Sequence, residues 1–260
     1  PNLRPKLLTF LAQKYGMKVT AEDLIAYIAG VAAHPAFTAR FQEDLSTPGL
    51  RIPFTSDGRT FAKVTELGRT IIWLHTFGER MSDPQKGRPA QPPRLPPARM
   101  PRVPAAGAIP QEPAAMPDSI HYDAGKKRLL AGQGYVENVG PAVWLYEVSG
   151  KQVLLQWFSY RKANRERPII GDRRTPSPLD GIQPDRWLAE NTTELINVLN
   201  VLGCLVDLEP AQAALLEIVC TGPAISAEEL RVAGAFEAQA QLRRGVTMSV
   251  GPGLFDTADM

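Results

Sequence analysis

The residues with the clearest chemical potential in this 260-residue sequence are basic and lie between Gly150 and Arg174. Seven Lys or Arg residues and only two acidic residues occur in this stretch. Such side chains neutralise phosphate charge, and arginine can also hydrogen bond to guanine edges in the major groove. The composition therefore makes these cations the leading candidates for contact with a nucleic acid: Lys151, Arg161, Lys162, Arg165, Arg167, Arg173 and Arg174.

Plainer interpretations stay open for the same stretch. A run of basic residues is also compatible with a solvated surface turn. Trp157 and Phe158 precede most of the cations on an expected helix, and such residues belong to a hydrophobic core more often than to a surface that stacks on bases.

Signatures of catalysis are missing from the sequence. No Gly-rich loop ends in Gly-Lys-Ser/Thr, no Asn-Pro-Pro-aromatic quartet is present, and no Gly-rich strand end resembles a methyl-donor pocket. Carboxylates followed by a suitably spaced lysine, as nucleases need, are not evident either. His34, His75 and His121 are far apart without ligand spacing. We therefore expect no catalytic residue, no metal and no cofactor in this chain.

Charge is distributed unevenly along the chain, although the net charge is only +2. Residues 175–260 contain four basic and twelve acidic residues, whereas residues 1–174 contain 25 basic and 15 acidic residues. A basic body beside an acidic tail suits a protein that presents one face to an anionic partner.

Other features of the sequence indicate the compartment of the protein and its relation to membranes. Cys204 and Cys220 each lie in an apolar stretch, which favours buried free thiols in a reducing cytoplasm. No run of about 18 apolar residues is present, so we expect no membrane partner. The first residue is Pro1 and no signal peptide follows, which favours a piece of a longer protein.

The pattern of residues divides the chain into three regions and predicts an α+β fold. Residues 1–82 are expected to be helical, with a capping box at Thr20 and Asp23 and helices from 21, over 36–45 and over 60–76. Residues 83–117 hold eleven of the 24 prolines and no periodic apolar face, so we expect a flexible insert that buries little, or else a partner-binding polyproline motif.

Residues 118–260 are expected to form a small, mostly antiparallel sheet with packed helices. Strand-like runs separated by glycine-containing turns cover residues 119–123, 128–131, 135–139 and 143–148. A helix is expected to follow from Gly150, and two further helices over residues 187–205 and 209–218, the second beginning just before Pro210.

Several segments resemble the C-terminal specificity region of single-chain type ISP and related type IIG restriction-modification enzymes. Those proteins typically carry Asp-x-x-x-Tyr-x-x-x-x-Leu-His-x-Pro-x-Tyr/Phe followed by Pro-Arg-Ile-Pro. Here Ala32 and Ala33 replace the Leu-His pair of the first motif, so His34 stands one place later, and Leu50 replaces the first proline of the second motif. The matching segments are residues 21–37 with Arg40 and Phe41, 50–54, 67–69 with Leu74 and His75, 146–153, Trp157 and 160–162.

This resemblance implies sequence-specific recognition of double-stranded DNA in a bacterial restriction-modification protein. The chain would position a target adenine for a methyltransferase domain of the same polypeptide, and S-adenosylmethionine would be that domain's cofactor. His34 and His75 would then be structural residues. Two other interpretations remain: a scaffold that docks the domains of a larger enzyme, and a nuclease or methyltransferase fragment with chemistry of its own.

Overall fold

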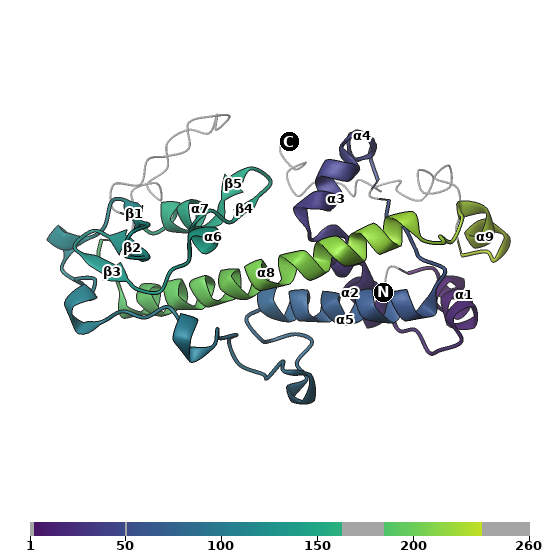
Figure 1. The fold of residues 1–260 in the computed structure, drawn as a ribbon, viewed down its shortest axis with the longest axis horizontal. Helices are drawn as coiled ribbons and strands as arrows, with labels where there is room; N and C mark the ends of the chain where they lie inside the picture. The colour runs from purple at the N-terminus through teal and green to yellow at the C-terminus, as the bar shows by residue number, and fades with distance from the viewer. Residues whose placement is uncertain (1–2, 50, 163–184, 236–260) are drawn as a thin grey trace, which may run out of the picture.

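One long helix, α8 (Ala189–Thr221), runs along most of the described molecule (Figure 1). The computed structural model describes residues 3–49, 51–162 and 185–235. A group of N-terminal helices packs at one end of α8, and a small sheet with two short helices packs at the other (Figure 1). Each end has its own hydrophobic core, and α8 contributes buried side chains to both. The expected α+β class is confirmed.

The N-terminal helices follow the sequence pattern closely. The capping box is present, since the Thr20 hydroxyl accepts from the Asp23 backbone N–H at 3.1 Å and the Asp23 carboxylate accepts from the Thr20 N–H at 2.8 Å. The single helix expected over 36–45 is wrong, because Phe41 leaves the helical region at φ −111° and ψ 24°. The helices are α1 (Pro5–Tyr15), α2 (Ala21–Ala32), α3 (Pro35–Arg40), α4 (Gln42–Leu45) and α5 (Gly58–His75).

Helices α2 and α5 cross at a pair of glycines. A Cβ atom at Gly68 would lie 1.7 Å from the carbonyl oxygen of Ala26, and one at Gly30 would lie 2.5 Å from that of Val64. Only the absence of a side chain permits this approach, because both obstructing atoms belong to backbone. The two helices are therefore held closer together than ordinary side-chain packing allows.

Tyr27 ties the extended segment before α5 to the same core. Its ring is fully buried and stacks on Phe54 and Phe61, with centroids 5.0 and 4.9 Å away. Its hydroxyl donates to the Pro53 carbonyl at 2.9 Å and accepts from the Thr55 N–H at 3.1 Å. One buried hydroxyl thus satisfies two backbone groups of this extended segment.

Three antiparallel strands form the sheet at the other end of α8. They are β1 (Ile120–Asp123), β2 (Arg128–Ala131) and β3 (Gly134–Val136), in that order. They overlap three of the four predicted runs, although β3 ends at Val136 and the predicted run continued to residue 139. Leu129 in the central strand pairs with Tyr122 on one side and Val136 on the other. Leu129 and Val136 are fully buried, so one face of the sheet closes the core.

The fourth predicted strand, residues 143–148, is wrong for most of its length. Pro141 starts a short helix, α6 (Pro141–Trp144), because its fixed φ suits a first helical position. Only β4 (Glu147–Val148) remains extended, and it pairs with β5 (Lys151–Gln152) around Ser149 and Gly150 at φ 52° and 73°. The expected helix then begins slightly later, as α7 (Val153–Ser159).

Helix α8 is continuous where two helices were predicted. Pro210 lies inside it and removes one backbone donor, which normally interrupts a helix. Burial on both sides of the proline offsets this cost, since Leu205 lies in the core beside the sheet and Leu216 in the core of the N-terminal helices. A short helix, α9 (Ala227–Val232), follows and has a capping box of its own.

The expectation that the Pro-rich segment buries little is wrong. Leu95 is 6% exposed and lies directly over Gly203 of α8, where an added Cβ would come within 2.5 Å of it. The Leu95 N–H donates to the side chain of buried Asn200 at 2.8 Å. The segment has isolated apolar residues that fill particular gaps, which a periodicity analysis does not detect. Its turns are η1 (Pro84–Lys86), η2 (Pro97–Arg99), η3 (Ala105–Gly107) and η4 (Pro113–Ala115). The proposed domain boundaries at 82 and 117 stay predictions.

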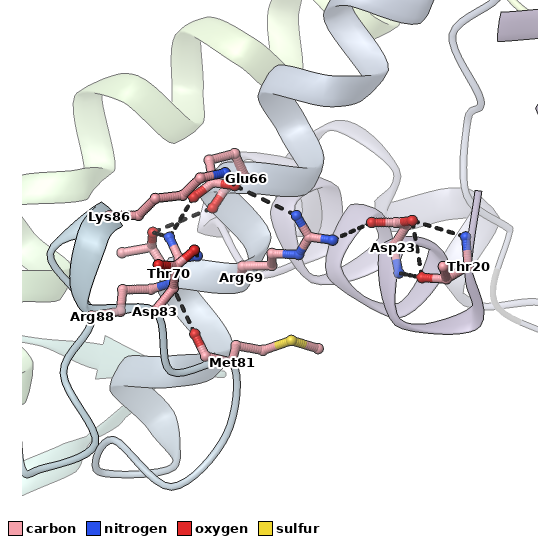
Figure 2. Close-up of polar contacts among 9 residues, drawn as sticks. All are labelled: Thr20, Asp23, Glu66, Arg69, Thr70, Met81, Asp83, Lys86 and Arg88. Atoms are coloured by element: carbon pink, nitrogen blue, oxygen red, sulfur yellow. Dashed lines mark hydrogen bonds and ion pairs between the residues drawn. The ribbon is translucent and has the colours of Figure 1, made fainter. Parts of the chain in front are cut away.

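Arg88 holds the beginning of this segment against α5 (Figure 2). Its side chain is almost completely buried, forms an ion pair with Glu66, and donates from Nε to the Met81 carbonyl at 2.9 Å. Burial raises the pKa of the Glu66 carboxyl, but hydrogen bonds from Arg88 and Lys86 outweigh it and hold this pKa below its usual value. Glu66 therefore remains charged and keeps the buried guanidinium paired.

Arg69 extends this network from α5 to the start of α2 (Figure 2). It lies 3.5 Å from a Glu66 carboxylate oxygen and also pairs with Asp23, the acid of the α2 capping box. The Pro-rich segment, α5 and the α2 N-terminus are thus joined by one chain of ionic contacts.

Replacing Gly68 with alanine should destabilise the protein by about 2–3 kcal/mol through overpacking. This loss should appear although alanine favours a helix interior over glycine by about 1 kcal/mol. Denaturant unfolding measures the difference. Gly140→Ala is the matched control, because its φ is −71° and nothing lies within 4 Å of an added Cβ. Equal stability of the two variants would mean that α2 and α5 do not approach this closely.

Replacing Leu95 with alanine should cost about 2–4 kcal/mol, because a cavity would remain beside α8. Thermal and denaturant unfolding report the change. Leu145→Ala serves as the control, since Leu145 is 64% exposed and its loss should change stability by less than about 0.5 kcal/mol. If Leu95→Ala behaves like Leu145→Ala, the Pro-rich segment contributes nothing to the core.

Candidate nucleic-acid interface

The seven predicted contact residues fall into two groups. Lys151 lies on β5, and Arg161 and Lys162 directly follow α7. The structure thus brings three of the seven to the part of the sheet domain around α7. The other four lie outside the described residues: Arg165, Arg167, Arg173 and Arg174.

Lys151 is presented by the tight β4–β5 hairpin. Ser149 and Gly150 occupy the two turn positions with positive φ, which is the conformation that suits the right-handed twist of a hairpin. The hairpin continues into α7 through a hydrogen bond from the Val153 N–H to the Tyr146 carbonyl at 3.0 Å. Lys151 is exposed, and it has no ion-pair partner in the part of the chain that the structure describes.

Unlike Lys151, Arg161 has its charge neutralised by an acid of α8, Glu194. Its Nε and Nη2 atoms donate to one carboxylate oxygen of Glu194 at 3.0 and 2.7 Å. Its Nη1 donates to the Trp157 carbonyl at 3.0 Å, and the guanidinium lies 4.3 Å from the centre of the Trp157 ring. The side chain is therefore committed to contacts within the protein, and its geometry fits the positioning of α7 better than phosphate contact.

The aromatic residues of α7 belong to the core. Phe158 is 3% exposed and packs beside Trp187, which is fully buried. Trp157 is half-buried, with its ring edge-on to Trp187 at a centroid distance of 6.2 Å. The interpretation of both α7 aromatics as core residues is confirmed.

Three arginines from separate segments pair with acids on α8. This helix contains five acidic residues and no basic residue. Besides Arg161, Arg40 of α3 lies 2.5 Å from Glu217, and Arg99 of η2 donates to Asp207 at 2.9 Å. Part of the charge difference between the two parts of the sequence is thus neutralised by ion pairs within the protein, so the difference does not by itself describe a face for an anionic partner.

A second group of exposed cations lies at the β1–β2 turn, outside the basic stretch predicted to contact a nucleic acid. Lys126 and Lys127 are exposed and have no ion-pair partner within residues 3–49, 51–162 and 185–235. Arg102 of the Pro-rich segment lies nearby, since its backbone pairs with that of Glu137 after β3. The Lys126-Lys127-Arg128 run between two predicted strands was the sequence signal that could have found this group.

A cavity of about 310 Å³ lies beside the same turn, between the Pro-rich segment, the start of α6 and α8. Its walls are mainly apolar, with Leu95, Val143 and Leu199 among them. Lys127 and Asn138 also line it, and both have positive φ, an uncommon conformation for residues other than glycine.

Two classes of feature are not found in the described part of the chain. No group of three or more His, Cys, Asp or Glu residues there is arranged to hold a metal ion. None of the described helices combines the length and the apolar character needed to cross a membrane.

The family description that matches this chain is the Type ISP C-terminal specificity domain, and the match covers residues 1–198. The chain belongs to this family. The resemblance seen in the sequence is thereby confirmed. The matched region ends inside α8, although residues after it, such as Leu202 and Leu216, complete both cores.

Two solved structures to which this chain is similar are much longer chains. The cryoEM structure of a DrdV–DNA complex has a TM-score of 0.47 and 17% sequence identity, and the similarity covers 84% of this chain and 20% of that one. A nuclease-deletion mutant of the Type ISP restriction-modification enzyme LlaGI, in complex with a DNA substrate mimic, has a TM-score of 0.46 and 17% identity, covering 77% and 14%. No curated protein matches the chain.

The Arg161–Glu194 pair should show a coupling free energy of about 0.5–1 kcal/mol in a double-mutant cycle of unfolding stability. The pair joins α7 to α8, and the coupling should fall as salt is raised. Arg161→Ala alone should cost more than the coupling, because it also removes the contact with the Trp157 ring. The exposed Arg231–Glu228 pair of α9 is the comparison and should give a smaller value. A coupling of zero would leave Arg161 as a free cation.

Proposed function

We propose that this chain recognises a specific sequence in double-stranded DNA as the target recognition part of a restriction-modification enzyme. The observation that carries this proposal is membership of the Type ISP C-terminal specificity domain family over residues 1–198. Exposed cations in two places support it, because phosphate neutralisation by lysine and arginine supplies a large share of affinity for DNA.

The proposed division of labour gives each part of the fold a role. Helix α8 holds the N-terminal helices and the sheet at fixed positions, as its side chains lie in both cores. The proposed DNA contacts in the stretch between Gly150 and Arg174 are Lys151, Lys162 and the four arginines at positions 165, 167, 173 and 174. Arg161 positions α7 through Glu194, and contacts to phosphate would orient the duplex while contacts to base edges select its sequence.

The chain spans 20% and 14% of the two longer chains whose folds are similar. We propose that catalysis belongs to a methyltransferase domain of the same polypeptide, which would use S-adenosylmethionine and receive the target adenine. No residue of this chain is assigned a catalytic step. The proposed location is the bacterial cytoplasm, where the DNA lies.

Changing Arg165, Arg167, Arg173 and Arg174 together to alanine should weaken duplex binding and its dependence on salt. If all four contact phosphates, the slope of log affinity against log salt concentration should fall by roughly 3–4 units, at about 0.9 per contact. If one of them instead pairs with a guanine, its single replacement should cost about 1–3 kcal/mol on the cognate site and much less on other sequences. Fluorescence anisotropy over a salt series measures both effects.

A matched control removes four exposed cations from the N-terminal helices and their connections: Lys18, Arg51, Arg59 and Lys63. This control should change the slope less. Equal losses from both sets would indicate general electrostatics without a localised interface. Failure of the unmodified chain to bind a duplex at low salt would contradict the proposed function and favour a scaffold that docks other domains.

A further inference from the structure

We propose that the β1–β2 turn and Arg102 form a second contact for the DNA phosphate backbone, separate from the stretch between Gly150 and Arg174. We call the group Arg102, Lys126 and Lys127 the basic corner. The inference rests on the proposed function, because it assigns a further surface to the same DNA ligand. It is carried by the way the fold presents these three cations.

The two lysines stand on a turn that the protein holds in one conformation. The Asp123 carboxylate accepts a hydrogen bond from the Lys126 N–H at 3.0 Å, which closes the turn at the end of β1. Lys127 has φ 51°, and its carbonyl accepts from the Val139 N–H at 3.0 Å. A lysine rarely adopts this backbone conformation unless its surroundings impose it. The backbone that carries both lysines is therefore ordered before any ligand arrives, which lowers the ordering cost of binding.

Arg102 is brought to the same corner by backbone pairing. Its N–H donates to the Glu137 carbonyl at 3.2 Å, and the Glu137 N–H donates to the Arg102 carbonyl at 2.8 Å. The next residue, Asn138, donates from its side chain to the Met100 carbonyl at 3.1 Å. Val139 then bonds to Lys127, so residues 137–139 join Arg102 and the turn directly.

The corner keeps an excess of positive charge after its ion pairs are counted. Two carboxylates lie there, against the three cations of the corner and Arg128. Asp123 accepts from the backbone of the turn. Glu137 is held by Arg128 at 2.7 Å, and the Arg128 guanidinium lies 4.2 Å from the centre of the Tyr135 ring. Arg102 reaches the same carboxylate only at 3.4 Å, and its side chain is 70% exposed. One carboxylate is thus shared by two guanidinium groups, and the more exposed one remains able to bind a further anion.

The arrangement fits a polyanion better than a single small anion. A small anion would need several donors converging on one buried point, whereas these cations are exposed and spread over two segments. Successive phosphates of a duplex carry charge along a surface and can meet separate cations one by one. Arg99 lies close by but is paired with Asp207, so it is not counted among the contacts.

The test compares two triple alanine variants of the 260-residue chain. Removing Arg102, Lys126 and Lys127 should reduce the slope of log affinity against log salt by roughly 2–3 units, at about 0.9 per contact. The control variant removes Lys18, Arg59 and Lys63, which carry the same number of positive charges on the N-terminal helical part. It should reduce this slope by less than about 0.9, the value expected for a single phosphate contact. Thermal unfolding of both variants establishes that they are folded.

A second measurement needs no variant. Acetylation of exposed lysines, read by mass spectrometry, should be slowed at Lys126 and Lys127 by a bound 30-base-pair duplex (about three helical turns) and unchanged at Lys18 and Lys63. If the chain binds DNA but both lysines stay fully reactive, or both triple variants lose the same slope, the basic corner is refuted and the proposed function stands. If the unmodified chain does not bind a duplex, the proposed function fails and the corner with it.

Discussion

The fold depends on α8 being one rigid element shared by two cores. Leu195 and Leu205 lie in the core beside the sheet, whereas Leu216 and Val219 lie in the core of the N-terminal helices. A helix of 33 residues spans both, so the two ends cannot rotate independently without unpacking one of them. Under the proposed function, such a spacer would hold separate contacts in register along a duplex and would lower the ordering cost of binding.

Ion pairs with acids of α8 also determine which cations remain available to a ligand. Its acids pair with Arg40, Arg99 and Arg161, each from a different segment. These ion pairs are partly exposed and add little stability individually, but they fix side chains that would otherwise be counted as free positive charge. Surface charge is therefore informative only after internal pairs are removed. Lys151, Lys126 and Lys127 are among the exposed cations that remain, as are Lys18 and Lys63 on the N-terminal part.

Local patterns in the sequence predicted the local features well. The capping box at Thr20 and the three strands of the sheet depend on contacts between near neighbours, which spacing reveals. Features set by distant contacts were missed. Pro210 indicated a helix start, but burial at both ends of α8 outweighs the proline. Leu95 lies among prolines without periodicity, and only Gly203, more than a hundred residues later, explains why it is buried.

At the candidate interface, too, position along the sequence does not show which residues are in contact. A cluster of cations along the chain made Arg161 a candidate contact, whereas in the folded protein its charge is neutralised by Glu194, 33 residues away in sequence. Conversely, Arg102 and Lys127 are far apart in sequence, and residues 137–139 bring them together through backbone hydrogen bonds. Charge density along a sequence reports how many cations exist, whereas the sheet and α8 determine which of them share a surface. Recognition surfaces in this chain are thus a consequence of pairing geometry as much as of composition.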